Sequence, residues 1–374
     1  MKKIFTAFIL AIMLTSTAWA NLVYTTSNGK LGIINTQNVK SILSPVVQYS
    51  NLGSHTFAVS YWNGNESRLM AIKRTTDKKT SGDTVIVFKS ANLSEPIKAS
   101  SDVLTGVYNT QSVVNTYNGR GLLLASRENA SIMELSTSDF SYMKSYVYDD
   151  YNEDMTTPHT QGVLVNYSSI YGLFDIGKGN SVLMRFDGQL REHVEGSFKV
   201  SFDQETQCVS WLSGSRVAVG TSEGVGVVGK NGFDMLVTTD QPVKAVCNDK
   251  SSGFYFITQE ESGDKYVSTL YHYTNDQITT LTEGEIGADC TLASLNSNTT
   301  LAAIIGEKIL IYDTSNDSLL KEFDSDALGG VPVSLAYRYT SGEKSDSSSG
   351  NCNISYAGII LLLTFAALKT RHIK

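Results

Sequence analysis

Residues 290–323 read CTLASLNSNTTLAAIIGEKILIYDTSNDSLLKEF and contain four short apolar runs separated by polar turns. The runs are 290–295, 301–305, 309–313 and 319–323. The residues between them are mainly Asn, Ser, Thr, Asp and Gly, which favour turns, so the stretch predicts four antiparallel strands joined by tight connections. A single unit of this kind is too thin to bury both of its faces, and it therefore needs neighbours of the same type.

The last two runs of this unit have counterparts along the whole chain. Seven times an apolar alternating run is followed by a polar turn and a second apolar run; the first runs are 30–34, 84–88, 131–135, 181–186, 224–228, 267–271 and 308–312. Their spacing of roughly 35 to 55 residues is typical of the four-stranded blades of a β-propeller. The pattern resembles the WD40, YVTN and quinoprotein-like propellers, and this resemblance implies an all-β fold.

The two ends of the repeat region complement each other. Only one apolar run, 22–26, precedes the first hairpin, so the first unit lacks a strand, and one unassigned run, 333–337, remains after the seventh unit. We therefore predict a seven-bladed β-propeller over residues 21–340 that is closed by a C-terminal strand in the first blade. Six or eight blades are the alternatives, because the runs 46–49 and 198–202 can be counted differently.

The N-terminus has the pattern of a secretory signal over residues 1–20. Lys2 and Lys3 precede an apolar run, and small residues end at Ala20, so we expect cleavage before Asn21. At the other end, a Ser/Gly-rich linker (341–353) precedes an apolar segment (354–368) and a basic tail (369–374). The apolar segment would span about 22 Å as a helix, against about 30 Å of hydrocarbon, and the basic flank predicts that the tail stays in the cytoplasm. We expect an exported protein of the cell envelope or surface with a C-terminal transmembrane helix.

The C-terminal pattern also resembles bacterial C-terminal sorting signals of the CTERM type, especially the cysteine-containing synergist and myxobacterial kinds. The matching residues are 347–353 (SSSGNCN), then Tyr356-Ala357-Gly358 and the Ile/Leu run. The resemblance implies a dedicated sorting protease as a partner, with Cys352 as the point of processing or of lipid attachment. A plain single-span anchor is the alternative.

The charge of the exported part limits its partners. Residues 21–353 hold all 37 acidic residues and 25 of the 30 basic ones, which gives a net charge of −12. Such a surface argues against nucleic acid and against docking on anionic lipid. We therefore expect proteins, peptides or glycans of the envelope as partners.

Two matches to catalytic patterns are better explained by hairpins. Residues 220–224 fit the nucleophile elbow and 224–229 fit the dinucleotide fingerprint, but both need a following helix, and a second strand follows here. Cys208, Cys247 and Cys290 fall on expected innermost strands at different heights, so we expect three buried, unpaired thiols. We expect no cofactor and no catalytic residue.

The long connections between blades are expected on one face. They are 43–56, 101–112, 149–161 and 196–207, together with the loop 75–83. The predicted binding residues on this face are Tyr49, Tyr108, Tyr148, Asp149, Asp150, Tyr151, Glu153, Asp154 and His159. Tyrosine beside acidic residues suits polar, amphipathic partners. Asp150, Asn152 and Asp154 alternate as calcium ligands do, but the glycine of such a loop is missing, so a solvated acidic loop is the main interpretation.

We therefore expect a monomeric interaction module and no enzymatic activity. Two alternatives stay open, a propeller enzyme of the lactonase-like or quinoprotein-like kind and an assembly factor of the cell envelope.

Overall fold

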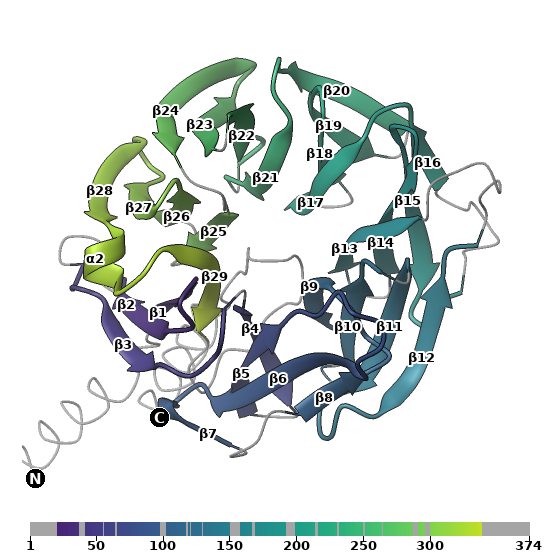
Figure 1. Cartoon of the computed structure of the whole chain (residues 1–374). Helices are drawn as coiled ribbons and strands as arrows, with labels where there is room; N and C mark the ends of the chain where they lie inside the picture. Colours follow the sequence, from purple (N-terminus) through teal and green to yellow (C-terminus); the bar gives the residue numbers. More distant parts are fainter. Residues whose placement is uncertain are drawn as a thin grey trace, which may run out of the picture.

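Seven antiparallel sheets surround a common axis (Figure 1). The innermost strand of a sheet is its first strand in chain order, except in blade 1, where it is the last strand of the chain. The computed structural model describes residues 21–36, 42–54, 56–63, 66–97, 102–116, 119, 121–128, 130–149, 158–166, 169–191, 199–213, 216–229, 232–249, 251–263, 265–286, 291–295 and 300–338. The predicted all-β, seven-bladed propeller is confirmed.

Blades 1 to 3 use the chain from residue 21 to residue 147 together with the last strand. Their strands are β29 (Pro332–Arg338), β1 (Asn21–Thr26), β2 (Leu31–Asn35) and β3 (Val46–Tyr49) in blade 1; β4 (Thr56–Asn63), β5 (Glu66–Lys73), β6 (Gly82–Lys89), β7 (Asn92–Pro96) and β8 (Asp102–Thr105) in blade 2; and β9 (Thr110–Asn115), β10 (Gly121–Ser126), β11 (Ser131–Ser136) and β12 (Tyr142–Val147) in blade 3.

Blades 4 to 7 follow in chain order around the ring. Their strands are β13 (His159–Asn166), β14 (Ser169–Gly177), β15 (Asn180–Asp187) and β16 (Lys199–Phe202); β17 (Thr206–Ser213), β18 (Arg216–Thr221), β19 (Gly224–Gly229) and β20 (Gly232–Thr238); β21 (Val243–Asn248), β22 (Phe254–Ser262), β23 (Lys265–Thr274) and β24 (Gln277–Ile286); and β25 (Thr291–Leu295), β26 (Thr300–Ile305), β27 (Lys308–Asp313) and β28 (Ser318–Phe323). One short helix, α2 (Ser325–Leu328), precedes β29.

Burial decreases from the second strand of a blade to its outer strand. Every residue of β1, β10 and β26 is buried, because both faces of these strands pack against neighbouring blades. The outer strand β12 has only half-buried and exposed residues. The apolar runs of the sequence therefore correspond to the strands that must be covered on both sides.

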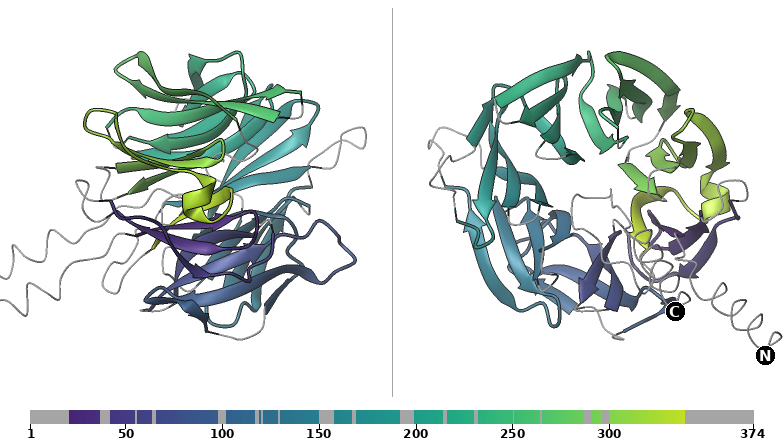
Figure 2. Two further views of the ribbon diagram at one scale, coloured as in Figure 1. Left: turned by 60° about the vertical axis from the view of Figure 1, so that its left-hand side comes forward. Right: turned by 180° about the vertical axis from the view of Figure 1, so that it is seen from behind.

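The predicted closure of the ring is confirmed. β29 pairs antiparallel with β1, with Val23 opposite Ala336 and Asn21 opposite Arg338, so the two ends of the described chain lie in one sheet (Figures 1 and 2). The count of seven also holds, because β3 and β16 are the outer strands of blades 1 and 4. The segment 101–112 was expected to be a connection and instead contains β8, which pairs with β6 beside β7.

Asparagines at the ends of two innermost strands join neighbouring blades. Asn115 Nδ2 donates to the Trp62 carbonyl at 3.1 Å and Asn115 Oδ1 accepts from the Trp62 N–H at 2.9 Å. Asn248 Nδ2 likewise donates to the carbonyls of Trp211 at 3.0 Å and Leu212 at 3.2 Å. These links fix the C-terminal ends of β9 and β21 against the innermost strands of the preceding blades.

Candidate functional site

Every innermost strand starts on the same face of the ring, which we call the entry face. On this face the chain passes from one blade to the next, and the second strand of each blade turns into the third. The opposite face holds the remaining turns, and we call it the exit face. The polar side chains on the two faces have different partners.

The innermost strands of four consecutive blades carry a β-bulge at the entry face. The pairing of β9 with β10 passes from Thr110–Ser126 to Ser112–Ala125, so Gln111 has no partner residue. Gln161, Gln207 and Lys244 are the extra residues at the same point of β13, β17 and β21. A bulge leaves its extra residue outside the ladder and redirects its side chain, and bulges are common beside functional sites.

The same position in blade 1 is also bulged, with Val333 as the extra residue, whereas β4 and β25 pair without interruption there. All five bulge residues are half-buried, and the residue before each of them is buried. We call Gln111, Gln161, Gln207, Lys244 and Val333 the inner rim.

The residues before the bulges are fixed by the third strand of the preceding blade. Thr110 donates its N–H to Asp83 Oδ2 at 2.8 Å, and Asp83 is fully buried. Thr160 Oγ1 donates to the Ser131 carbonyl at 3.2 Å, and the Thr206 N–H donates to Ser181 Oγ at 3.1 Å. The repeated link places the bulges at one height around the axis.

Polar contacts connect part of the inner rim. Lys244 Nζ donates to Gln207 Oε1 at 2.8 Å across the seam between blades 5 and 6, and Gln207 Nε2 donates to Glu205 Oε1 at 2.7 Å. Gln111 Nε2 donates to Asn109 Oδ1 at 2.9 Å. Among the described residues, Gln161 has no side-chain hydrogen bond, so its carboxamide can still donate and accept.

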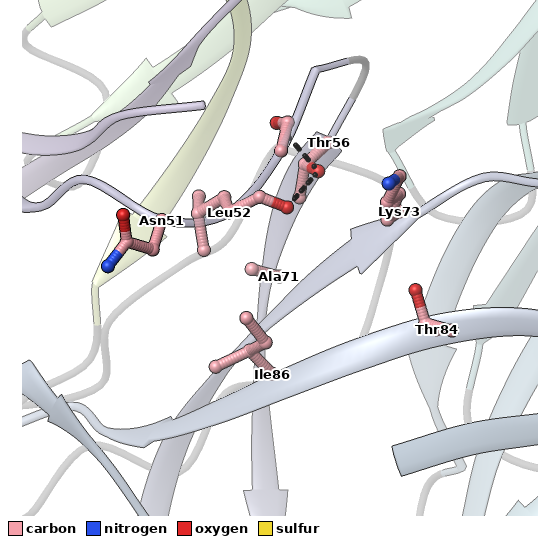
Figure 3. A pocket seen from close by; sticks show the side chains of 8 residues that line it. Asn51, Leu52, Thr56, Ala71, Lys73, Thr84 and Ile86 are labelled. Carbon is pink, nitrogen blue, oxygen red and sulfur yellow. Dashed lines mark hydrogen bonds between the residues drawn. The ribbon is translucent and has the colours of Figure 1, made fainter. Parts of the chain in front are cut away.

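A cavity of about 240 Å³ lies on the entry face between blades 1 and 2. Ala71 and Ile86 lie at its centre, Lys73 and Thr84 lie together on one side, and Asn51 lies on the other (Figure 3). Leu52, Gly53 and Thr56 complete the lining. The cavity combines an apolar floor with a polar edge.

The predicted binding residues fall in different environments. Tyr49 is half-buried against Phe88, with ring centroids 5.2 Å apart, and Tyr108 donates its hydroxyl to the Thr80 carbonyl at 3.2 Å. Tyr148 is 2% exposed and stacks on Phe174, so its ring lies in the core instead of on the entry face.

Of the remaining predicted residues, Asp149 is exposed, and His159 is half-buried with Nδ1 3.2 Å from the Arg127 carbonyl oxygen. Asp150, Tyr151, Asn152, Glu153 and Asp154 lie outside the described residues, as do Ala20 and Cys352. Asn21 is the first residue of β1. Within the described ranges no three His, Cys, Asp or Glu side chains are grouped in a way that could hold a metal ion.

The sequence contained a signal for the inner rim that the prediction missed. The dipeptide Thr-Gln occurs five times in the sequence, and three of these, at 110–111, 160–161 and 206–207, lie at or next to the start of three consecutive innermost strands. The predicted binding residues lie mainly in the long connections and include none of these glutamines.

Two further expectations concern the cysteines and the tail. Cys247 is disulfide-bonded, so the prediction of three unpaired thiols is wrong, whereas Cys208 is free. Across the described part of the chain, no helix is both long and apolar enough to cross a membrane, and the segment 354–368 lies outside that part.

The exit face carries a histidine between two carboxylates. His272 of β23 places Nδ1 2.7 Å from Asp317 Oδ2 and Nε2 3.2 Å from Asp249 Oδ2, and its ring stacks on Tyr255 at 4.1 Å. Asp249 follows β21 of blade 6, and Asp317 lies in the turn between β27 and β28 of blade 7. We call His272, Asp249 and Asp317 the seam cluster.

The seam cluster favours its charged form. Burial alone would lower the pKa of His272, but its hydrogen bonds to Asp249 and Asp317 outweigh burial, and the pKa is raised. Burial alone would raise the pKa of Asp249, but hydrogen bonds from His272 and Ser251 outweigh it, and the pKa is lowered. Burial, with the nearby charge of Asp317, raises the pKa of Tyr255, whose hydroxyl donates to Asp317 at 3.1 Å. The cluster therefore joins blades 6 and 7 through hydrogen bonds, which become an ion pair when His272 is protonated.

Fold and site define a seven-bladed β-propeller with a bulged polar rim at one end of its axis. No protein-family model and no curated protein matches the sequence. Among solved structures, the chain is similar to a "putative 6-phosphogluconolactonase" from Bacteroides fragilis, with a TM-score of 0.61 and 13% identity over 86% of this chain and 99% of the other.

Two further structures show the same likeness. A protein from Lactobacillus plantarum has a TM-score of 0.58 and 9% identity over 85% of this chain and 99% of the other. A functionally unknown protein from Desulfotomaculum acetoxidans has a TM-score of 0.55 and 11% identity over 86% and 99%. At these identities the likeness concerns the fold alone.

Proposed function

We propose that this protein is an exported propeller, anchored by its C-terminal segment, that binds a peptide or glycan of the cell envelope at the inner rim. The observation that carries the proposal is the bulge repeated at one position in four consecutive blades. Four independent register shifts bring three carboxamides and one ammonium to one height around the axis.

The chemistry of the inner rim suits such a partner. A carboxamide both donates and accepts hydrogen bonds, so Gln111, Gln161 and Gln207 match ligands that present both kinds of group, such as glycan hydroxyls and peptide amides. Lys244 adds one positive charge to a domain of net negative charge, which favours a partner with an acidic group close to its centre.

Export is supported by the signal pattern of residues 1–20 and by the disulfide of Cys247, because disulfides persist mainly in oxidising compartments. The apolar segment 354–368 and its basic flank support the anchor. Intact mass of the protein from its native envelope tests this part. We expect cleavage between Ala20 and Asn21, and either lipid or a new chain end near Cys352; an uncut N-terminus would contradict export.

Binding at the inner rim is tested with arrays of envelope glycans and of peptides, probed with the purified protein and with Gln161→Ala and Gln207→Ala variants. Each substitution removes one or two hydrogen bonds, each worth about 0.5–1.5 kcal/mol, so the double variant should bind at least about fivefold more weakly. Gln277→Ala is the matched control, because Gln277 is exposed at the start of the outer strand β24.

Loss of binding in the rim variants but not in the Gln277→Ala control supports the proposal. Unchanged binding by the double variant, or an equal loss in the control, would exclude the inner rim as the binding site.

A further inference from the structure

The cavity between blades 1 and 2 has walls that are held in place by the main chain. The Leu52 N–H donates to the Gly29 carbonyl at 3.0 Å, and Thr56 Oγ1 donates to the carbonyls of Leu52 at 3.1 Å and Gly53 at 3.2 Å. A Cβ atom on Gly29 would lie 2.7 Å from the Gly53 nitrogen, so the two backbones are in direct contact. A pre-formed wall of this kind lowers the entropic cost of binding.

Gly53 lies beside the side chain of Lys73. Gly53 has a φ of +83°, and a Cβ atom there would lie 3.4 Å from Lys73 Nζ and 3.5 Å from Lys73 Cδ. The stem of Lys73 therefore runs beside bare backbone at the edge of the cavity. Within the described ranges, its ammonium group has no hydrogen bond and no ion pair.

The strand register brings a hydroxyl to the same side. Lys73 of β5 pairs directly with Thr84 of β6, and Ala71 pairs with Ile86, so these four residues lie on one face of the blade 2 sheet (Figure 3). Lys73 and Thr84 supply a cation and a hydroxyl donor, and Ala71, Ile86 and Leu52 supply the apolar floor. An ammonium beside a hydroxyl is suited to a carboxylate.

The volume limits the size of the ligand. About 240 Å³ is the room of about eight water molecules and is below the range of drug-sized sites. A carboxylate with a short branched aliphatic chain has that size and matches both the floor and the edge.

We propose that this cavity binds an aliphatic carboxylate, with the carboxylate at Lys73 and Thr84 and the chain on Ala71 and Ile86. Such a group is offered by a free branched-chain acid and by the C-terminal residue of a peptide ending in leucine. The inference does not depend on the inner rim, because the cavity lies at a different seam of the entry face.

The test is a titration of the full protein with 4-methylpentanoate, followed by calorimetry or by NMR shifts. We expect saturable binding with a Kd of about 1 mM, as suits a ligand of this size. The neutral 4-methylpentanamide should bind at least tenfold more weakly. Lys73→Met keeps the stem and removes the charge, so it should weaken binding of the acid at least tenfold, and Thr84→Val should weaken it severalfold.

Lys79→Met is the matched control, since Lys79 is exposed in the loop between the same two strands and its removal changes the net charge equally. It should leave binding unchanged. Absence of saturable binding, equal affinity for the acid and the amide, or full affinity in Lys73→Met would each overturn the proposal.

An experiment with peptides distinguishes the two possible sources of the carboxylate, a free acid and a peptide C-terminus. Ala-Ala-Leu with a free carboxylate is compared with its C-terminal amide and with 4-methylpentanoate. Tighter binding of the free peptide identifies a peptide terminus as the ligand, and tighter binding of the small acid identifies a free acid; binding of the amidated peptide as tightly as the free one would contradict both. None of these outcomes bears on the rim variants, so the two proposals fail separately.

Discussion

Replacing His272 by glutamine should destabilise the protein in a pH-dependent way. The imidazole contacts Asp317 at 2.7 Å and Asp249 at 3.2 Å, and its side chain is only 9% exposed. We expect a loss of about 3 kcal/mol at pH 6 and a clearly smaller loss at pH 9.

The magnitude follows from the contacts that the substitution removes. A hydrogen bond to a charged group contributes about 1.5–3 kcal/mol, and His272 makes two, of which the longer one belongs at the low end of that range. Glutamine can retain one of them in neutral form. Asp249 is not left unsatisfied, because the N–H groups of Ser251 and Gly253 still donate to it at 2.7 and 3.1 Å. The expected loss therefore lies near the lower limit for breaking a buried ion pair.

The direction with pH follows from the raised pKa of His272. The unfolded chain binds this proton with a pKa of about 6.5, whereas the folded protein holds it more tightly. The stabilisation is therefore fully present below about pH 6.5 and is lost as the pH rises through the folded-state pKa. Asp249 has a lowered pKa and loses its contribution only in acid, so measurements above pH 5 isolate the histidine.

Urea unfolding of the wild type and of His272→Gln at pH 6 and pH 9, followed by tryptophan fluorescence, measures the difference. His159→Gln is the matched control, since the ring of His159 is hydrogen-bonded to a carbonyl and not to a carboxylate. An equal loss at both pH values, or a loss no larger than that of the control, would refute the ion-pair interpretation of the seam cluster.

Three further predictions concern the core and its motifs. Asp83→Ala should cost about 3–5 kcal/mol in urea unfolding, since the buried carboxylate of Asp83 accepts three backbone N–H groups, including that of Thr110; a loss below 1 kcal/mol would contradict its structural role. Gly224→Ala should lower the melting temperature by several degrees, because a Cβ there would lie 1.9 Å from the Val237 carbonyl oxygen, and the protein should show no NAD binding by fluorescence. Burial raises the pKa of Cys208 to about 12, so iodoacetamide should modify this thiol slowly at pH 8 until urea is added.

The strands were predictable from sequence where both faces are buried. The run 301–305 lies in β26, all of whose residues are buried, and such continuous apolar segments leave an unmistakable pattern. β8 was not predicted, because an outer strand does not need apolar residues at regular positions. Val103 is 41% exposed and Thr105 is also exposed. The closing strand β29 could be predicted because the first unit lacked one strand and one apolar run remained after the seventh. This count does not depend on the register in which the strands pair.

The inner rim could not be derived from periodicity. A bulge shifts the register by one residue, and this shift changes the direction of a side chain without changing the composition of the strand. Tyr148 was predicted at the binding surface because tyrosine is common at such surfaces. Its ring instead stacks on Phe174 of the next blade. The strand register decides the position of the inner rim, and the neighbouring blade decides the burial of Tyr148. A short run of sequence indicates neither the register nor the neighbouring blade.

The two faces of the ring differ in whether polar side chains without a protein partner among the described residues are found on them. On the exit face, Asn115 and Asn248 clamp neighbouring backbones, the seam cluster joins blades 6 and 7, and Cys247 is cross-linked, so polar groups there are used by the fold itself. On the entry face, the carboxamide of Gln161 and the ammonium of Lys73 have no side-chain partner among the described residues. Substitutions in the exit-face links should therefore change the free energy of unfolding and leave binding intact. Substitutions of Gln161 and Lys73 should leave the free energy of unfolding nearly unchanged and weaken binding. Links on the entry face, such as the one from the Thr110 N–H to Asp83, hold the starts of the innermost strands in place, so this face presents its free polar groups from a fixed scaffold.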